Sequence, residues 1–138
     1  MRRERRAQGF SLIELLVALA IVALLSAWAL PNVQAQMQRA RRIDATTTLL
    51  QAANWMERAA TAQGPYPMDR DHGGPGLPEA LTQSPDGHYR LTLEATDGQS
   101  FTLTAWPQGA QAHDACGWLR LDALGTRSAQ SGEARCWR

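Results

Sequence analysis

Two groups of residues in this sequence have side chains that could do chemistry. The carboxylate of Glu14 lies inside an otherwise apolar run, "GFSLIELLVALAIVALL". Asp69, Asp71 and His72 lie together in "MDRDHGG", where carboxylates and an imidazole are suited to binding a metal ion or transferring a proton. The elements around each group decide whether that chemistry is expected.

The group in "MDRDHGG" favours a solvated polar loop over a metal or catalytic site. It lies in "GPYPMDRDHGGPGLPEALTQSPDG", which is dense in Gly and Pro and therefore typical of a loop. The other histidines, His88 and His113, have no helical spacing to a second ligand. The sequence also lacks Gly-x-Ser-x-Gly, a phosphate loop and a metalloprotease signature. We therefore expect no enzyme activity, no cofactor and no metal.

The two cysteines, Cys116 and Cys136, both lie near the C-terminal end. If this part of the chain is exported, they can pair, because disulfides persist in oxidising compartments. The alternative is two unrelated free thiols. Neither a Cys-x-x-Cys motif nor a Cys/His spacing suggests zinc.

Length and charge set the broad class of the protein. The 138 residues suffice for one domain with a modest core. The net charge is +1, so no overall field indicates a nucleic-acid partner. The local cluster of Arg2, Arg3, Arg5 and Arg6 directly precedes the apolar run, and such a cluster favours a cytoplasmic N-terminus.

The apolar run covers residues 10–30, where the only polar side chains are Ser11, Glu14 and Ser26. As a helix rising ~1.5 Å per residue, it can cross a hydrocarbon core of ~30 Å. A secretory signal peptide cut at "AWA" and a plain membrane anchor are both possible. Neither gives Glu14 a role, although a carboxylate at the centre of a membrane helix is disfavoured by roughly 2.5–3.5 kcal/mol.

The same stretch resembles the N-terminus of type IV prepilins and the related pseudopilins. Gly9 and Phe10 match the processing junction of that family, and Glu14 matches its glutamate five residues into the mature chain. Pro31 falls where many pilins kink this helix. The resemblance implies cleavage after Gly9 by prepilin peptidase, which would remove the leader 1–9, and N-methylation of Phe10.

The resemblance also implies a role for Glu14 in assembly. A buried charge is tolerable when it is paired, so Glu14 is expected to meet an N-terminal amine at Phe10 in the fibre. The implied partners are other pilin subunits, prepilin peptidase and an inner-membrane assembly platform, with no nucleotide bound. The chain would sit in the inner membrane with its C-terminal domain periplasmic, and then in an extracellular fibre. Adhesion, twitching motility and DNA uptake are not separated by the sequence.

The fold expected from pattern and resemblance is the α+β pilin fold. One helix should run over about residues 10–62, bent near Pro31 and ended by Gly64-Pro65. Beyond Pro31 its apolar positions recur at helical spacing and should cover the sheet. These positions are Val33, Met37, Ala40, Ile43, Leu49, Leu50, Ala53 and Met56.

An antiparallel sheet of about four strands should follow. "HYRLTLEATDGQSFTLTAW" predicts a hairpin of strands 89–95 and 101–105. A three-residue loop at 96–98 would place Leu93 opposite Phe101 and turn the threonines outward, whereas a two-residue turn would mix the two faces.

The last part of the sheet should lie between the cysteines. A third strand is expected around 118–122 and a fourth near 126–129. The run "CGWLRLDALGTRSAQSGEARCW" resembles the pilin C-terminal region, which implies a bridge between Cys116 and Cys136.

The expected organisation has five segments: leader 1–9, assembly helix 10–31, amphipathic helix 32–63, connecting loop 64–87, and sheet with disulfide region 88–138. The best interpretation is a structural subunit of a type IV pilus, most like a minor pilin. Two alternatives remain. One is a type II secretion pseudopilin, which the paired cysteines disfavour. The other is a secreted disulfide-bonded binding domain or small enzyme, with its signal peptide cut after Ala29.

Overall fold

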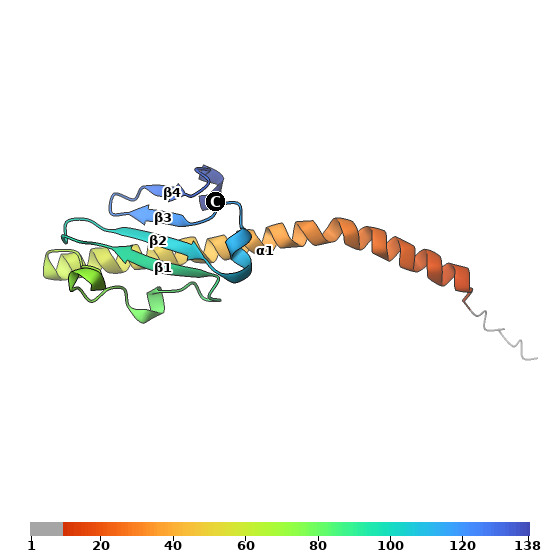
Figure 1. Ribbon diagram of the computed structural model, residues 1–138, viewed down its shortest axis with the longest axis horizontal. Helices are drawn as coiled ribbons and strands as arrows, with labels where there is room; N and C mark the ends of the chain where they lie inside the picture. The colour runs from red at the N-terminus through yellow and green to blue at the C-terminus, as the bar shows by residue number, and fades with distance from the viewer. Residues whose placement is uncertain (1–9) are drawn as a thin grey trace, which may run out of the picture. The chain divides into compact units, whose positions relative to one another are not determined.

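The computed structural model of the protein describes residues 10–138, so the leader 1–9 with Gly9 lies outside it. A single long helix is followed by a four-stranded sheet and four short 3-10 helices (Figure 1). Contacts divide the chain into a unit that ends at Gln36 and a second unit, Met37–Arg138, which we call the head.

The helix α1 spans Leu12–Gln63, close to the predicted bounds. Its C-terminal end is set by Gly64, whose φ of 96° suits a residue without a Cβ and whose N–H donates to Ala60 O at 2.8 Å. The helix continues through Pro31, and the kink expected at that residue stays a prediction.

The sheet is an antiparallel meander in the order β1-β2-β3-β4. Its strands are Tyr89–Glu94 (β1), Thr102–Pro107 (β2), Leu119–Asp122 (β3) and Arg127–Ala129 (β4). All four predicted strands are therefore confirmed. Within the head, one face of the sheet packs on α1, and the other, which we call the outer face, points away from it (Figure 1).

The predicted pairing of β1 with β2 was wrong by two residues. Leu93 lies opposite Leu103 instead of Phe101. The connection is longer than three residues because Ala95 pairs outside the hairpin: its N–H donates to Asp69 Oδ2 at 2.9 Å, and its carbonyl accepts from Asp69 N at 3.0 Å. A shift of two keeps every side chain on its predicted face, so the apolar residues still point to α1.

The helix stripe that packs on the sheet also differs from the expected one. The buried helix residues are Ala45, Thr48, Leu49, Ala52 and Met56, at the three- and four-residue spacing of one helix face. Alanine at two of these positions lets the sheet approach the helix closely. Most of the remaining predicted positions are exposed; these are Val33, Met37, Ala40, Ile43 and Leu50.

The sheet supplies the rest of the core. Fully buried side chains include Tyr89, Leu103 and Leu119, and the disulfide sulfurs close one end of the same cluster. Trp55 is half-buried against this core. Tyr66 and Phe101 pack edge to face with ring centroids 4.9 Å apart, which ties the loop after α1 to the start of β2.

Candidate functional site

The first turns of α1 form an apolar segment without an internal partner. An 18-residue window near the start of α1 has a mean hydropathy of 2.4 and is 0% buried. Large side chains stand out all around it, with Phe10 78% and Trp28 84% exposed. By length and composition this segment can cross a membrane, and its exposed surface needs lipid or other helices to cover it.

Glu14 sits in the first turn of α1. Ser11 begins the helix: its carbonyl accepts from Glu14 N at 3.1 Å, and its hydroxyl accepts from Ile13 N at 3.3 Å. A carboxylate at this position is favoured by the positive end of the helix dipole. The ion pairs between described residues do not involve Glu14, which leaves its carboxylate available to another chain or to Phe10, one turn away.

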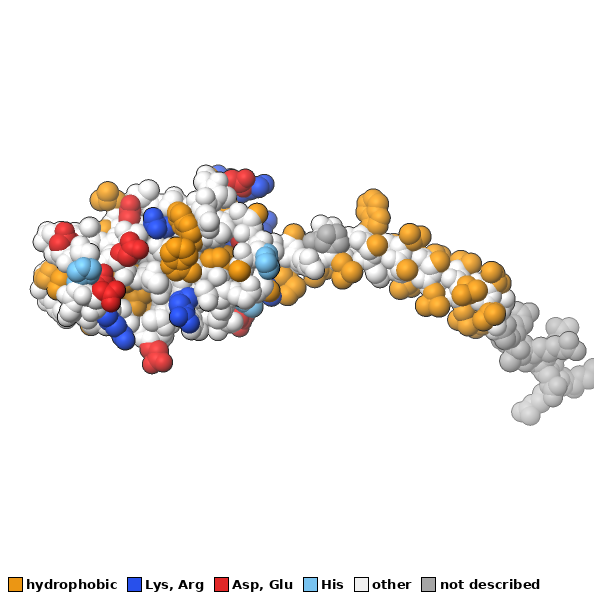
Figure 2. Space-filling view, viewed as in Figure 1, with side chains coloured by type: hydrophobic (Ala, Val, Ile, Leu, Met, Phe, Trp, Pro, Cys, Tyr) orange, Lys and Arg blue, Asp and Glu red, His pale blue; other side chains and the backbone are white. Residues whose placement is uncertain are grey.

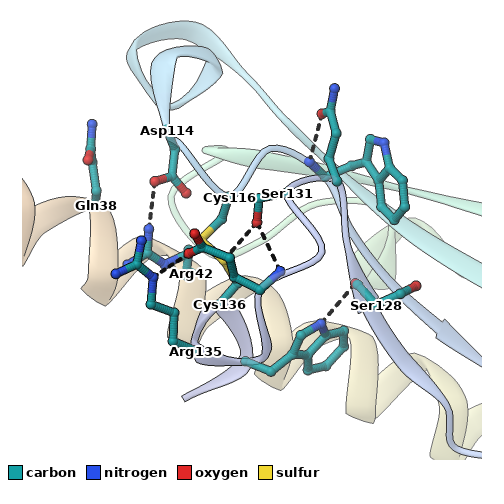
Figure 3. The surroundings of a disulfide bond; sticks show 12 residues. Gln38, Arg42, Asp114, Cys116, Ser128, Ser131, Arg135 and Cys136 are labelled. Atoms are coloured by element: carbon teal, nitrogen blue, oxygen red, sulfur yellow. Dashed lines mark hydrogen bonds and ion pairs between the residues drawn. A yellow bond between two sulfur atoms is a disulfide. The ribbon is translucent and has the colours of Figure 1, made fainter.

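The disulfide joins Cys116 to Cys136 with their Cα atoms 5.7 Å apart (Figure 3). Cys116 follows the short helix η3 (Gly109–His113), and Cys136 lies in η4 (Ala134–Trp137). The bridge therefore ties the C-terminal end of the chain to the connection between β2 and β3.

Next to the disulfide, a buried polar network fixes α1 to the segment after β2. Arg42 Nη1 donates to Asp114 Oδ1 at 2.6 Å, and the Tyr89 hydroxyl donates to Asp114 Oδ2 at 3.3 Å. Gln111 Nε2 donates to the Tyr89 hydroxyl at 3.1 Å and to Gln38 O at 3.3 Å. Burial raises the pKa of Tyr89 to about 12, so its hydroxyl stays protonated and able to donate. Arg42 and Asp114 are visible in Figure 3.

The structure gives Asp69 a role in holding the loop. Asp69 Oδ1 accepts from His72 N at 3.0 Å and contacts His72 Nδ1 at 2.6 Å, while Oδ2 accepts from Ala95 N. The hydrogen bond from Ala95, followed by that from His72, lowers the pKa of Asp69. Asp71 is exposed in η1 (Arg70–His72). Over residues 10–138, no three His, Cys, Asp or Glu side chains converge as metal ligands.

The outer face of the sheet carries a group of residues that the sequence analysis did not single out. Arg90 pairs with Trp106 across β1 and β2, and Trp118 directly precedes β3. These side chains and Arg120 alternate with core residues along their strands, which is the signal that could have found them. We call Arg90, Trp106, Trp118 and Arg120 the outer-face patch.

The outer-face patch is ordered by contacts within the sheet. Arg120 stacks over the Trp118 ring, 4.6 Å from its centroid, and its Nε donates to Thr104 Oγ1 at 3.2 Å. Trp106 Nε1 donates to Thr92 Oγ1 at 3.1 Å. Thr104 is fully buried although it lies on the outer face, so side chains cover it as a layer. Figure 2 shows hydrophobic atoms beside arginines on the sheet.

Comparison with known proteins gives two family matches. Residues 31–120 match the family described as "Type IV minor pilin ComP, DNA uptake sequence receptor". Residues 5–30 match the "Prokaryotic N-terminal methylation motif". None of the curated proteins compared with the chain matches it.

A solved structure extends the comparison to the fold. The chain is similar to a type IV pilin from Shewanella oneidensis, with 30% sequence identity and a TM-score of 0.56. The alignment covers 73% of this chain and 98% of the other. The helix-on-sheet arrangement is thus the arrangement expected from the resemblance.

Proposed function

Because the chain belongs to the type IV minor pilin family, we propose that it is a minor subunit of a pilus, assembled through residues 10–31. The observation that carries this proposal is the apolar segment around Glu14, which is exposed all round yet joined by one helix to a well-packed head. Such a segment suits a membrane first and a bundle of like helices afterwards. The family and fold are those of a structural subunit rather than an enzyme.

Processing would make this segment competent for assembly. We propose that prepilin peptidase removes residues 1–9 after Gly9 and that Phe10 is N-methylated. The amphipathic helix 32–63 then continues from the assembly helix into the head, and residues 64–138 complete the head. Before assembly the N-terminus faces the cytoplasm and the head the periplasm, and afterwards the chain is part of an extracellular fibre.

N-terminal sequencing and mass spectrometry of the mature chain test this processing. A methylated Phe10 at the start supports it. A start at Leu30 would instead support a signal peptide cut after Ala29 and remove the pilin role. Mass spectrometry of sheared fibres separates a minor pilin, present at trace levels, from a type II secretion pseudopilin.

Glu14 would fix the position of the subunit within the fibre. Its carboxylate is unfavourable in lipid and becomes tolerable when paired with an N-terminal amine, so pairing favours transfer from membrane to fibre. Losing one partner of a buried ion pair typically costs ~3–5 kcal/mol.

We therefore predict that Glu14→Ala inserts into the membrane normally but is largely lost from fibres. Quantifying the chain in membrane and sheared-fibre fractions measures both steps. The matched control is Glu79→Ala, which removes an exposed carboxylate of the head and should assemble as wild type. Normal incorporation of Glu14→Ala would contradict the role given to Glu14.

Among the functions of such fibres, we propose DNA uptake for this chain. The family that matches residues 31–120 is described as a DNA uptake sequence receptor, and the matched range includes β1, β2 and the first half of β3. Exposed arginine and tryptophan side chains on the outer face are suited to binding DNA. A strain without this chain should still make pili but take up labelled DNA poorly. Unchanged uptake would contradict this function.

A further inference from the structure

We propose that the free edge of β1 is a docking site for an extended peptide segment of a partner protein, and that this segment carries lysine or arginine side chains. The segment would pair with Leu93 as an added strand, and its cations would meet Asp71 and Glu79. The site is separate from the proposed role in DNA uptake, because an acidic surface repels phosphates.

The backbone of β1 has one side without a neighbouring strand among the described residues (Figure 1). In an antiparallel ladder, the N–H and C=O of one residue point to the same side, and successive residues alternate between the two sides. The carbonyl of His88 accepts from Gln108 N at 2.8 Å, so the even-numbered positions of β1 face β2. The odd-numbered positions face the free edge; these are Tyr89, Leu91, Leu93 and, just after β1, Ala95.

The chain between α1 and β1 covers both ends of this edge and leaves its middle open. At one end, Leu91 N donates to Thr82 O at 2.8 Å. At the other end, Ala95 N donates to the Asp69 carboxylate, and Ala95 O accepts from Asp69 N. Within the described part of the chain, no hydrogen bond outside the strand ladder reaches Leu91 O, Leu93 N or Leu93 O. Three backbone groups are therefore available to another chain.

The open part of the edge forms one wall of a pocket of about 640 Å³, a size typical of ligand sites. The connecting chain forms the facing wall, which is held in place by its own hydrogen bonds. Gly74 N donates to Asp69 O at 2.9 Å, Gly76 N donates to Met68 O at 3.2 Å, and the Leu77 side chain is buried. Because both walls are formed before binding, a ligand loses less affinity to ordering the site.

The charges of the pocket select a cationic ligand. Asp69, Asp71 and Glu79 line it against the single cation of Arg70, so three negative charges and one positive charge sum to −2. The chain as a whole carries +1. Asp71 and Glu79 are exposed, and the ion pairs between described residues include neither of them. Arg70 Nε donates to Pro75 O at 3.4 Å, which directs this cation to its own loop.

An antiparallel segment would satisfy all three open backbone groups. Its residue opposite Leu93 would donate to Leu93 O and accept from Leu93 N, and its residue two positions later would donate to Leu91 O. Thr82 and Asp69 occupy the edge on either side, so only a short extended stretch of the partner fits. Main-chain hydrogen bonds then give affinity, and the carboxylates give specificity for basic side chains.

The first test measures peptide binding to the full chain in non-ionic detergent micelles by fluorescence anisotropy. The probe is a mixture of labelled, end-capped five-residue peptides with lysine at the second and fourth positions and threonine, valine or serine elsewhere. One matched mixture has glutamate in place of lysine. A second keeps lysine but carries methyl groups on the three central amide nitrogens, which removes the main-chain donors and keeps the charge.

We expect the lysine mixture to bind and the glutamate mixture to bind more weakly. The methylated mixture should bind roughly 25-fold more weakly than the lysine mixture, because it loses two hydrogen bonds at about 5-fold each. Equal binding by the methylated mixture would overturn strand pairing, and equal binding by the glutamate mixture would overturn the selection of basic side chains. No binding of the lysine mixture at about 1 mM would remove the docking site.

The second test locates the contact by hydrogen exchange of single amides. In the free chain, Leu93 N–H should exchange faster than Leu91 N–H, which is bonded to Thr82 O. At about ten times its Kd, the lysine mixture should slow exchange at Leu93 about 10-fold. The amide of Thr92 is the internal control, because it already lies in the ladder with β2 and should not change. A Leu93 amide that the peptides leave unchanged would contradict the site.

The third test removes the charges of the pocket. Asp71→Asn with Glu79→Gln should weaken binding of the lysine mixture about 2- to 30-fold, the range for two exposed ion pairs. The matched control is Asp86→Asn with Glu133→Gln, which removes the same charge from exposed positions outside the pocket and should bind as wild type. If both double variants bind alike, these carboxylates do not select the partner and the proposal fails.

The same measurements distinguish a partner protein from a second copy of this chain. If the Leu93 amide becomes protected as the concentration of the chain rises without peptide, the edge pairs with another copy, and a foreign partner is refuted. Failure of this docking site leaves the pilus subunit and its role in DNA uptake unaffected, because neither rests on the free edge of β1.

Discussion

Arg42 and Asp114 form a buried ion pair. Removing one of the two partners should destabilise the head by more than the pair itself stabilises it. The Asp114 side chain is 1% exposed and that of Arg42 17% exposed, so both charges have given up most of their water. The Tyr89 hydroxyl also donates to Asp114, which satisfies the carboxylate further. Removing the cation alone would leave a buried carboxylate with only a neutral donor.

Arg42→Ala is therefore expected to lower the free energy of unfolding of the head by about 3–5 kcal/mol. Chemical denaturation measured by circular dichroism checks this. Arg39→Ala removes an exposed arginine three residues earlier on α1 and should change stability little. Adding Asp114→Asn to Arg42→Ala should restore part of the loss, and a double variant less stable than Arg42→Ala would contradict the explanation.

Asp69 makes the stability of the head depend on pH in the acidic range. Its pKa lies below the ordinary value of 3.8, chiefly because the Ala95 N–H donates to its carboxylate. The folded chain then binds fewer protons than the unfolded chain at acidic pH. The contribution of Asp69 to the stability of the head is complete above pH 3.8. It is lost as the pH falls through the lower pKa that Asp69 has in the folded chain.

Asp69→Asn should consequently flatten the fall in melting temperature below about pH 4. Thermal unfolding at several pH values measures the slope. Asp71→Asn, at an exposed site two residues away, should keep the wild-type slope. Identical slopes for wild type and Asp69→Asn would show that this carboxylate contributes nothing.

Single residues differ in how far the sequence reveals their role. Glu14 is recognisable because a carboxylate in an apolar run is costly and therefore conspicuous. Arg42 and Asp114 are separated by 72 positions and belong to ordinary polar segments, so only the folded chain brings them together. The outer-face tryptophans are an intermediate case, because alternation along the strands predicts their face but not their contacts. Trp106 donates to Thr92, and Trp118 is covered by Arg120, which itself donates to Thr104.

Among the elements, the connection between β1 and β2 depends on one glycine. Gly98 has φ 69° and is buried, and its carbonyl accepts from Tyr66 N at 2.9 Å. A Cβ added there would lie 2.9 Å from Pro65 Cβ. The connection therefore packs directly on the chain that follows α1.

Gly98→Ala should destabilise the head by about 1–3 kcal/mol from backbone strain, with a further loss from the contact with Pro65. Gly125→Ala is the matched control, because Gly125 has φ 79° with nothing within 4 Å of an added Cβ. The destabilisation caused by Gly125→Ala should come from backbone strain alone. Denaturation curves of the two variants give the difference, and a Gly98→Ala variant no less stable than Gly125→Ala would contradict the packing argument.

The elements themselves could be predicted better than their pairing. Periodicity and turn residues gave α1 and all four strands to within a few residues. The register of β1 and β2 was missed because Asp69, far away in the sequence, binds Ala95 and lengthens the connection. The packed face of α1 was missed because apolar residues occur on two of its faces, and only the sheet selects Ala45 and Ala52 over Ile43 and Leu50.

In the molecule as a whole, the small head is held together by the packing of one helix on four short strands and by one disulfide bridge. The disulfide closes a loop with a sequence separation of 20, which contains β3, β4 and the start of η4. In the chain-entropy model a loop of this size stabilises the folded state by ~3 kcal/mol. This contribution is large beside the total stability of a domain of this size.

Cys116→Ser with Cys136→Ser should lower the free energy of unfolding by ~3 kcal/mol and leave leader removal unchanged. Melting under non-reducing conditions and electrophoresis of the mature chain measure the two effects. Reduced wild-type protein is the matched control, since it loses the bridge without a substitution. An unchanged melting temperature in the double variant would count against a stabilising bridge.

The meander of the sheet has a consequence for how the head comes to be folded. Every strand pairs with its neighbour in the sequence, and α1, which carries the first side of the core, precedes them all. Contacts that are local in sequence need little loop closure and form quickly. A chain made from its N-terminal end can therefore add β1, β2, β3 and β4 to α1 in the order in which they are synthesised. The bridge between Cys116 and Cys136 spans β3 and β4, so it can close around them only after both strands have been made.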